Sequence, residues 1–175
     1  MRGARSVLSM AIAILVAGCA PPTDVAESNK QVVMAAGEAL NNKRYDDLGK
    51  YIAESYHRHC QATPDINIET LADYTAMMKE YDGAFADGRL EFFQLIAEGD
   101  FVAFTGSYLG THTGQMGPFP ATGKTVDSEF AGYHRFENGK IVETWITWDN
   151  MAMMQQLGLL PSLQGGAGDD GSYQK

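Results

Sequence analysis

Apolar residues in the first half of the chain recur with the spacing of helices. They appear every three or four positions over 29–40 and 69–81, and a shorter amphipathic stretch covers 45–52. This period is typical of helices that bury one face. We therefore predict three helices in these ranges, the first of them capped by Ser28.

The second half changes to the two-residue alternation of β-strands. Extended runs cover 89–98, 101–109, 125–137 and 140–148, and a short final helix is expected over 151–157. Helices followed by an antiparallel meander indicate an α+β fold rather than an α/β fold. We expect a curved sheet that packs on the N-terminal helices and encloses a pocket.

The last two strands are joined by Asn138-Gly139, which predicts a two-residue type I′ turn. Such a turn fixes the register of the hairpin, so side chains can be paired from the sequence. The predicted pairs on one face are Phe136–Ile141, His134–Glu143, Gly132–Trp145, Phe130–Thr147 and Ser128–Asp149. Titratable groups on an otherwise apolar face are unfavourable unless they are paired or used, so this face is the candidate site.

The first 18 residues are predicted to be a signal peptide. A basic start precedes an apolar run over 7–16 that is too short to cross a membrane as a helix. The sequence LVAGC at 15–19 resembles the lipobox of bacterial lipoproteins, which implies lipidation of Cys19; a simple secretory signal is the alternative. We expect an exported protein, lipid-anchored to the cell envelope. Ala20 favours the outer membrane, facing the periplasm, in a cell with two membranes.

Charge and composition restrict the partners and divide the chain. The net charge is −9, and removal of 1–18 leaves 11 basic and 22 acidic residues, or −11. Such a surface does not attract nucleic acid or anionic lipid. We expect a lipidated cysteine and tether at 19–28, one domain at 29–161, and a disordered Gly- and Asp-rich tail at 162–175.

Several short blocks resemble the SnoaL-like polyketide cyclases in their order and spacing. The resemblance extends over about 29–161, and its blocks are 95–103 (LIAEGDFVA), 110–114 (GTHTG), 120–124 (PATGK), 138–143 (NGKIVE) and 155–158 (QQLG). It implies a cone-like α+β fold of the nuclear-transport-factor type with a deep, mostly apolar pocket. The founding enzymes close the last ring of an aromatic polyketide ester by aldol condensation, with no metal or organic cofactor.

In this family an aspartate removes a proton next to a carbonyl and a histidine assists. The resemblance assigns these roles to Asp149 and His134. The chain departs from the family at 58–60, where Arg-His-Cys replaces the Asp-His-Asp of many relatives. The founding cyclases also act in the cytoplasm, where a lipid-anchored exported protein would not meet their substrates.

The candidate residues have chemical and structural interpretations. Asp149 is either the general base or the N-cap of the final helix, and His134 with Glu143 is either an acid–base pair or an ion pair. The predicted ligand contacts are His59, Tyr74, His112, Glu143 and Trp145, with His112 on a loop at the pocket mouth. His57 and His59 lack the carboxylates of a metal cluster, so no metal is predicted.

Three functions are consistent with the sequence. The first is a cofactor-free cyclase, isomerase or hydrolase that transfers protons on a hydrophobic carbonyl compound. The second is a non-catalytic lipoprotein that binds an apolar small molecule in the same pocket. The third is a protein–protein module, since this type of fold often forms homodimers through its open sheet face.

Overall fold

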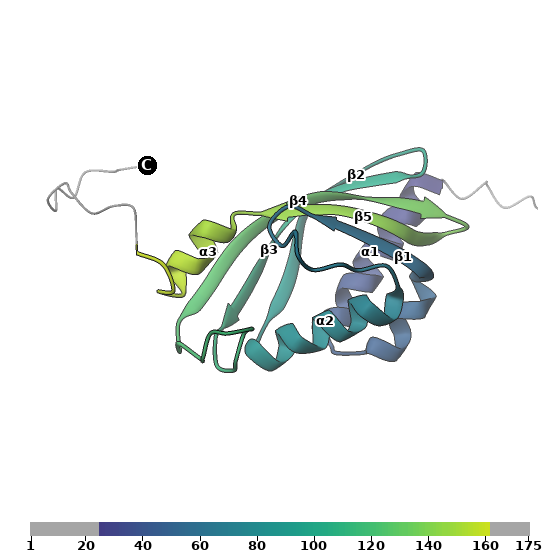
Figure 1. Cartoon of the computed structure of the whole chain (residues 1–175). Coiled ribbons are helices and arrows are strands. Elements are labelled where there is room, and N and C mark those ends of the chain that lie inside the picture. Colours follow the sequence, from purple (N-terminus) through teal and green to yellow (C-terminus); the bar gives the residue numbers. More distant parts are fainter. Residues whose placement is uncertain (1–24, 162–175) are drawn as a thin grey trace, which may run out of the picture.

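Five strands form one curved sheet in the order β1-β5-β4-β3-β2 (Figure 1). The computed structural model describes residues 25–161, so the predicted signal peptide, lipidation site and tail lie outside the described residues. The elements are α1 (Val25–Asn41), the 3₁₀ helix η1 (Tyr45–Lys50), β1 (Ile52–Cys60), α2 (Leu71–Ala84), β2 (Arg89–Glu98), β3 (Phe101–Thr111), β4 (Thr125–Glu137), β5 (Lys140–Trp148) and α3 (Asn150–Gln156). The α+β prediction is confirmed.

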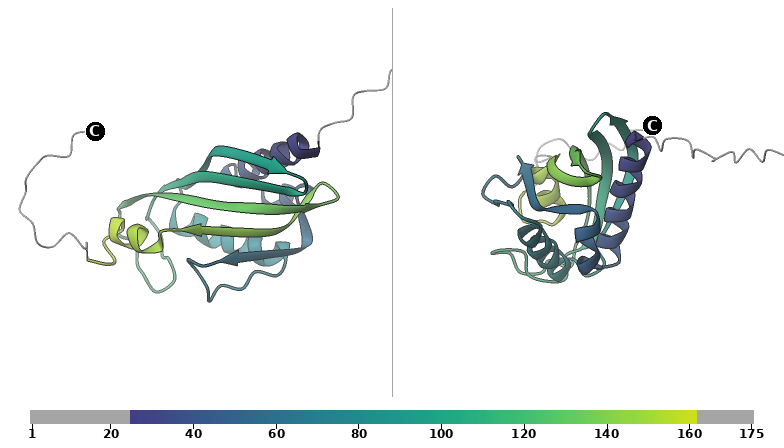
Figure 2. Two further views of the ribbon diagram at one scale, coloured as in Figure 1. Left: turned by 90° about the horizontal axis from the view of Figure 1, so that it is seen from above. Right: turned by 90° about the vertical axis from the view of Figure 1, so that its right-hand side faces the viewer.

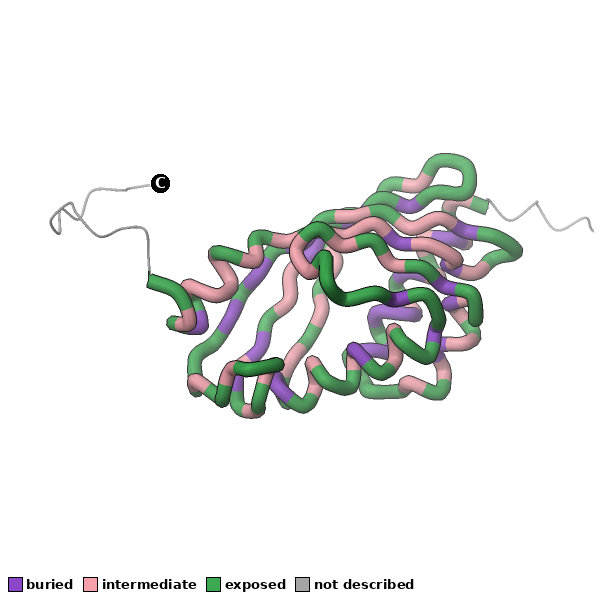
Figure 3. Tube along the Cα trace, viewed as in Figure 1, coloured by how far each residue is buried: buried purple, intermediate pink, exposed green. Residues whose placement is uncertain are grey.

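The sheet curls around the helices on its inner face. α1 packs against β2 and β3, and α2 packs against β1, while α3 lies against β4 at one end of the sheet (Figure 2). Buried and exposed positions alternate along much of β3 and β4 (Figure 3). Among residues 25–161, no helix combines the length and hydropathy needed to cross a bilayer.

The strand β1 was not predicted, and it makes the sheet mixed. It pairs in parallel with β5, with Arg58 opposite Thr144 and His59 opposite Trp145. Its sequence, IAESYHRHC, contains one β-branched residue and many polar ones. Local propensity is therefore weak, and the strand is fixed by its tertiary pairing.

A β-bulge in the β4–β5 hairpin changes which side chains share a face. The turn has positive φ at Asn138 (51°) and Gly139 (74°), as predicted, and Phe136 pairs with Ile141. Beyond the bulge the register shifts by one residue, so that Arg135 pairs with Glu143 and His134 with Thr144.

The predicted pairs His134–Glu143, Gly132–Trp145, Phe130–Thr147 and Ser128–Asp149 are therefore wrong. A shift of one residue moves every following side chain of a strand to the other face. Thr144, Ile146 and Trp148 face the helices in place of Glu143, Trp145 and Thr147.

The first helix also begins earlier than predicted. α1 starts at Val25, within the range expected to be a tether, and Ser28 lies inside it rather than at its N-cap. Residues 25–28, about one helical turn, therefore belong to the folded domain.

Candidate functional site

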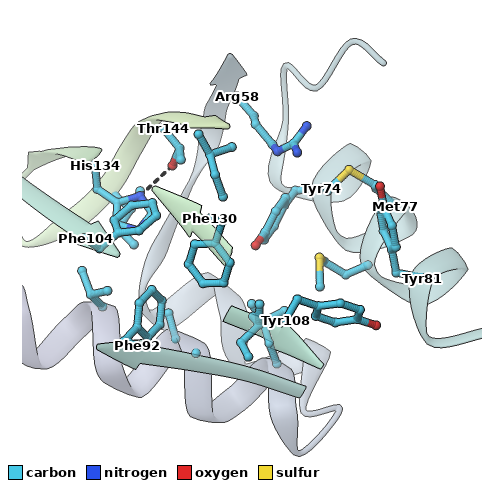
Figure 4. A pocket seen from close by; sticks show the side chains of 18 of the residues that line it. Arg58, Tyr74, Met77, Tyr81, Phe92, Phe104, Tyr108, Phe130, His134 and Thr144 are labelled. Atoms are coloured by element: carbon cyan, nitrogen blue, oxygen red, sulfur yellow. Dashed lines mark hydrogen bonds between the residues drawn. The ribbon is translucent and has the colours of Figure 1, made fainter. Parts of the chain in front are cut away.

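A cavity of about 150 Å³ lies between the inner face of the sheet and helices α1 and α2. Figure 4 shows aromatic side chains around it, from β2, β3, β4 and α2. Most of its lining is apolar, and none of the described lining residues is an aspartate or a glutamate. The cavity therefore suits an apolar molecule with a few polar atoms.

Three phenylalanines form one wall of the cavity. The ring centroid of Phe92 lies 5.7 Å from that of Phe104 and 5.8 Å from that of Phe130, with the rings nearly perpendicular. A Cβ atom added at Gly132 would meet the Phe104 ring at 2.7 Å, and one added at Gly106 would meet the Phe130 ring at 2.6 Å. These strand glycines thus make room for the rings on the inner face.

His134 is the only histidine among the described residues that line the cavity. Its Nδ1 lies 2.8 Å from Oγ1 of Thr144, and its ring centroid lies 4.5 Å from that of Phe104. Burial lowers the pKa of His134 to about 3, because its surroundings solvate the imidazolium poorly. The imidazole is therefore neutral at pH 7.

Two tyrosines extend the polar part of the lining. Burial raises the pKa of Tyr56 strongly, while a hydrogen bond with Thr144 opposes the rise. Tyr74, a predicted ligand contact, does line the cavity, and its ring packs edge-on against Tyr56 at 5.1 Å. Both phenols are neutral hydrogen-bonding groups at neutral pH.

Arg58, Thr144 and His134 form a row across β1, β5 and β4. Arg58 and Thr144 are register partners, as are Thr144 and His134, and all three line the cavity. The Arg58 guanidinium carbon lies 5.6 Å from the ring centroid of Trp148. The inner face therefore presents a cation, a hydroxyl and a neutral imidazole side by side.

Asp149 does not lie with His134. Its Oδ1 accepts a hydrogen bond of 2.9 Å from the backbone N–H of Ala152 and caps α3, and the residue is exposed. It follows Thr144 by five residues, which is about 16 Å along a strand. The described structure therefore gives Asp149 the N-cap position, and the predicted Asp149–His134 pair does not form.

Three further predicted ligand contacts gather on the outer face of the sheet. Glu143 accepts a hydrogen bond of 2.9 Å from Arg135 and lies 2.8 Å from His59, whose ring stacks on Trp145 at 4.8 Å. Hydrogen bonds, first with His59 and then with Arg135, hold the pKa of Glu143 below its usual value, against the opposing effect of burial. His59, Glu143 and Trp145 therefore lie on the far side of the sheet from the cavity.

His112 is fully buried but does not line the cavity. Its ring stacks on Phe85 at 5.2 Å, and its Nδ1 lies 3.1 Å from Oγ1 of Thr122. This arrangement ties the 112–124 loop to the end of α2. Within residues 25–161, no group of three or more His, Cys, Asp or Glu side chains could hold a metal ion.

Sequence reasoning missed Thr144 and gave Arg58 no role. Thr144 was assigned to the wrong face because nothing in the hairpin sequence marks the bulge. Arg58 belongs to the unpredicted strand β1, and its departure from the family pattern was the one signal that could have singled it out.

Comparison with known proteins identifies the fold and the family. A profile of the SnoaL-like polyketide cyclases matches residues 30–157. No protein of curated function matches the sequence. Several solved structures resemble the whole domain.

IdmH from Streptomyces antibioticus, provisionally assigned as a polyketide cyclase, is 24% identical, with a TM-score of 0.66 over 74% of this chain and 98% of its own. AclR from Streptomyces galilaeus, provisionally assigned as a hydroxylase, is 25% identical, with a TM-score of 0.69 over 79% of this chain and 85% of its own.

A provisionally assigned SnoaL-like polyketide cyclase from Jannaschia sp. CCS1 is 15% identical, with a TM-score of 0.71 over 82% of this chain and 100% of its own. The curved sheet over N-terminal helices is the cone fold of nuclear-transport-factor-like proteins. At the level of the family, these matches support an enzyme of cyclase or isomerase type. The chain belongs to the SnoaL-like polyketide cyclase family.

Proposed function

We propose that this protein is a cofactor-free cyclase- or isomerase-type enzyme that transfers a proton on an apolar carbonyl compound. The observation that carries the proposal is the His134–Thr144 pair, with 2.8 Å between Nδ1 and Oγ1, in an otherwise apolar cavity. A hydrophobic molecule in this cavity would bring its carbonyl group next to an imidazole held by a single partner.

In the proposed mechanism Nδ1–H of His134 donates to Thr144, and the Thr144 hydroxyl donates to Tyr56. This tautomer leaves the lone pair of Nε2 free to accept a proton from the carbon next to the carbonyl. The imidazolium then returns the proton to the oxygen that has gained the charge, so the net reaction needs no oxidant or reductant. Because the pKa of His134 is lowered to about 3, the basic form is fully populated at neutral pH.

The proposal gives the proton transfer to His134 alone. The finer expectation of a shared Asp149–His134 mechanism would require Asp149 to leave the α3 N-cap, where its carboxylate is already hydrogen-bonded. The Asp149→Asn variant tests that expectation.

Solvent-deuterium incorporation tests the proposed activity with any ketone that enters the cavity. A panel of apolar ketones that begins with 2-tetralone is incubated with the protein in D₂O, and exchange next to the carbonyl is followed by NMR. We expect exchange above the rate of buffer alone. Binding of the ketones without any protein-dependent exchange would contradict an enzymatic role.

The second candidate function is non-catalytic binding of an apolar molecule, and the absence of any carboxylate from the described cavity lining favours it. A base of low pKa removes a carbon-bound proton less readily than a carboxylate of ordinary pKa does. Mass spectrometry of the protein as purified from cells would identify a retained ligand. A stoichiometric apolar ligand together with no exchange on any ketone would favour this function.

We also propose that the domain is anchored to the cell envelope through lipidated Cys19. The support is the LVAGC sequence at 15–19, after a basic start and a short apolar run. Membrane fractionation of wild type and Cys19→Ser tests this proposal. We expect the wild-type protein in the membrane fraction with a lipid-shifted mass, and an unlipidated chain for the variant; an unmodified wild-type Cys19 would contradict it.

A further inference from the structure

We infer that the cavity binds a molecule with an anionic group, a carboxylate above all, that pairs with Arg58. This inference rests on the proposed function only in that it describes the ligand of the same cavity. It adds that the ligand carries a negative charge, which the proposed function does not require of an apolar carbonyl compound.

The first support is the missing carboxylate partner of Arg58. The structure describes four arginines, and three of them lie within 4 Å of a carboxylate oxygen: Arg44 near Asp47, Arg89 near Glu91 and Arg135 near Glu143. Arg58 has no such partner within residues 25–161, although the chain carries 22 acidic residues. In the same part of the chain, its only side-chain hydrogen bond is a long one of 3.4 Å to Oγ1 of Thr63.

The second support is that the positive charge of Arg58 acts on groups that line the cavity. The side chain is half-buried and lines the cavity, and Figure 4 shows it close to Tyr74. Burial raises the pKa values of Tyr56, Tyr74 and Tyr81, and the positive charge of Arg58 opposes the rise at each of them. Arg58 thus acts electrostatically on three phenols that line the cavity, so its field reaches the space a ligand would occupy.

The third support is the way the guanidinium is held. Trp148 lies under it at 5.6 Å, and this contact restricts the guanidinium while leaving its N–H donors available. A planar guanidinium that is positioned in this way matches the two oxygens of a carboxylate. A half-buried cation without a counter-ion is also unfavourable, and a ligand anion would remove that penalty.

The row of Arg58, Thr144 and His134 sets the distance between the anionic group of the ligand and its reacting carbonyl group. Arg58 and His134 lie two strand spacings apart with Thr144 between them, which is on the order of 10 Å between their backbones. A single ligand could therefore place its carboxylate at Arg58 and a carbonyl at His134, with its apolar part against the phenylalanine wall. The inferred ligand class is an apolar oxo-acid or a related acid.

The test compares matched acids and amides on the full chain as cells produce it. The probes are phenylacetate, naphthalene-2-carboxylate and decanoate, each with its primary amide, and affinities are measured by calorimetry at pH 7.5. We expect wild type to bind at least one acid roughly tenfold or more tightly than its amide, as for a charge-assisted hydrogen bond. No acid that binds more tightly than its amide, or no binding by any of the acids, would overturn the inference.

Two arginine variants assign the preference to Arg58. Arg58→Met should abolish the preference for the acid and keep the affinity for the amide, which also shows that the cavity is intact. Arg89→Met, on the exposed side of β2, changes the net charge equally and should keep the preference. A preference that survives in Arg58→Met would overturn the inference.

The deuterium-exchange assay separates failure of this inference from failure of the proposed activity. Loss of the acid preference in Arg58→Met without any ketone exchange by wild type supports the anion site and rejects the enzyme. Exchange by wild type with equal affinities for acids and amides rejects the anion site and supports the enzyme.

Discussion

Oγ1 of Thr144 lies 2.8 Å from Nδ1 of His134, and this contact exists only because a bulge shifts the β4–β5 register by one residue. Without the bulge, Glu143 would face His134 and a carboxylate would enter the cavity. With it, the cavity keeps a hydroxyl beside the imidazole, while Glu143 pairs with His59 and Arg135 on the outer face.

Replacement of Thr144 by valine should destabilise the protein and remove the hydrogen bond that fixes which ring nitrogen of His134 carries the proton. Valine keeps the shape of threonine but leaves Nδ1 without a partner, which lowers the free energy of unfolding by about 1–3 kcal/mol. Thr144→Ser is the matched control because it keeps the hydroxyl. Urea unfolding and ¹⁵N NMR of the histidines measure both effects; a valine variant with wild-type stability and unchanged ring-nitrogen shifts would show that the contact has no role.

Replacement of Gly132 by alanine should disturb the aromatic wall of the cavity. The added Cβ would lie 2.2 Å from the carbonyl oxygen of Trp145 and 2.7 Å from the Phe104 ring, so the backbone must shift. We expect a loss of about 1–3 kcal/mol in the free energy of unfolding. Gly83→Ala in α2 is the control, since nothing lies within 4 Å of its added Cβ; an equal effect of the two substitutions would contradict this packing.

The low pKa of His134 predicts a specific dependence of stability on pH. An unfolded histidine takes up its proton near pH 6.5, but native His134 does so only near 3, so the unfolded state binds more protons between these values. The free energy of unfolding therefore falls as pH falls through that range. From pH 7.5 to 5.0 the contribution of His134 should be about 2 kcal/mol.

Urea unfolding of wild type and His134→Gln at both pH values isolates this contribution, because the other histidines are common to the two proteins. We expect the variant to lose less stability on acidification than wild type. Equal losses would mean that His134 titrates normally in the folded protein.

Substitutions at Asp149 distinguish a helix cap from a catalytic base. Asparagine caps a helix about as well as aspartate, whereas alanine removes the bond to Ala152 and should lower the free energy of unfolding by about 1 kcal/mol. We expect Asp149→Asn to keep both its stability and its ketone exchange. A stable Asp149→Asn variant without exchange would instead identify Asp149 as the base.

The elements of the fold could be predicted from the sequence, but not the composition of the site. The periodic segments gave the helices and four strands, because alternation and turn chemistry are local properties. β1 could not be predicted, since its polar sequence depends on β5 for its pairing. The bulge between the Phe136–Ile141 and Arg135–Glu143 pairs could not be predicted either, and its one extra residue in β5 decided whether Glu143 or Thr144 faced His134.

In the proposed reaction, a carbonyl compound in the cavity exchanges a proton on the carbon next to its carbonyl group with Nε2 of His134. The rate of deuterium incorporation into 2-tetralone, or into the best ketone of the panel, is measured with wild type, His134→Gln and Glu143→Gln. Glu143 lies on the outer face and serves as the matched control. We expect a loss of roughly 100-fold or more in His134→Gln and a wild-type rate in Glu143→Gln. A folded His134→Gln variant that exchanges the ketone at the wild-type rate would contradict it.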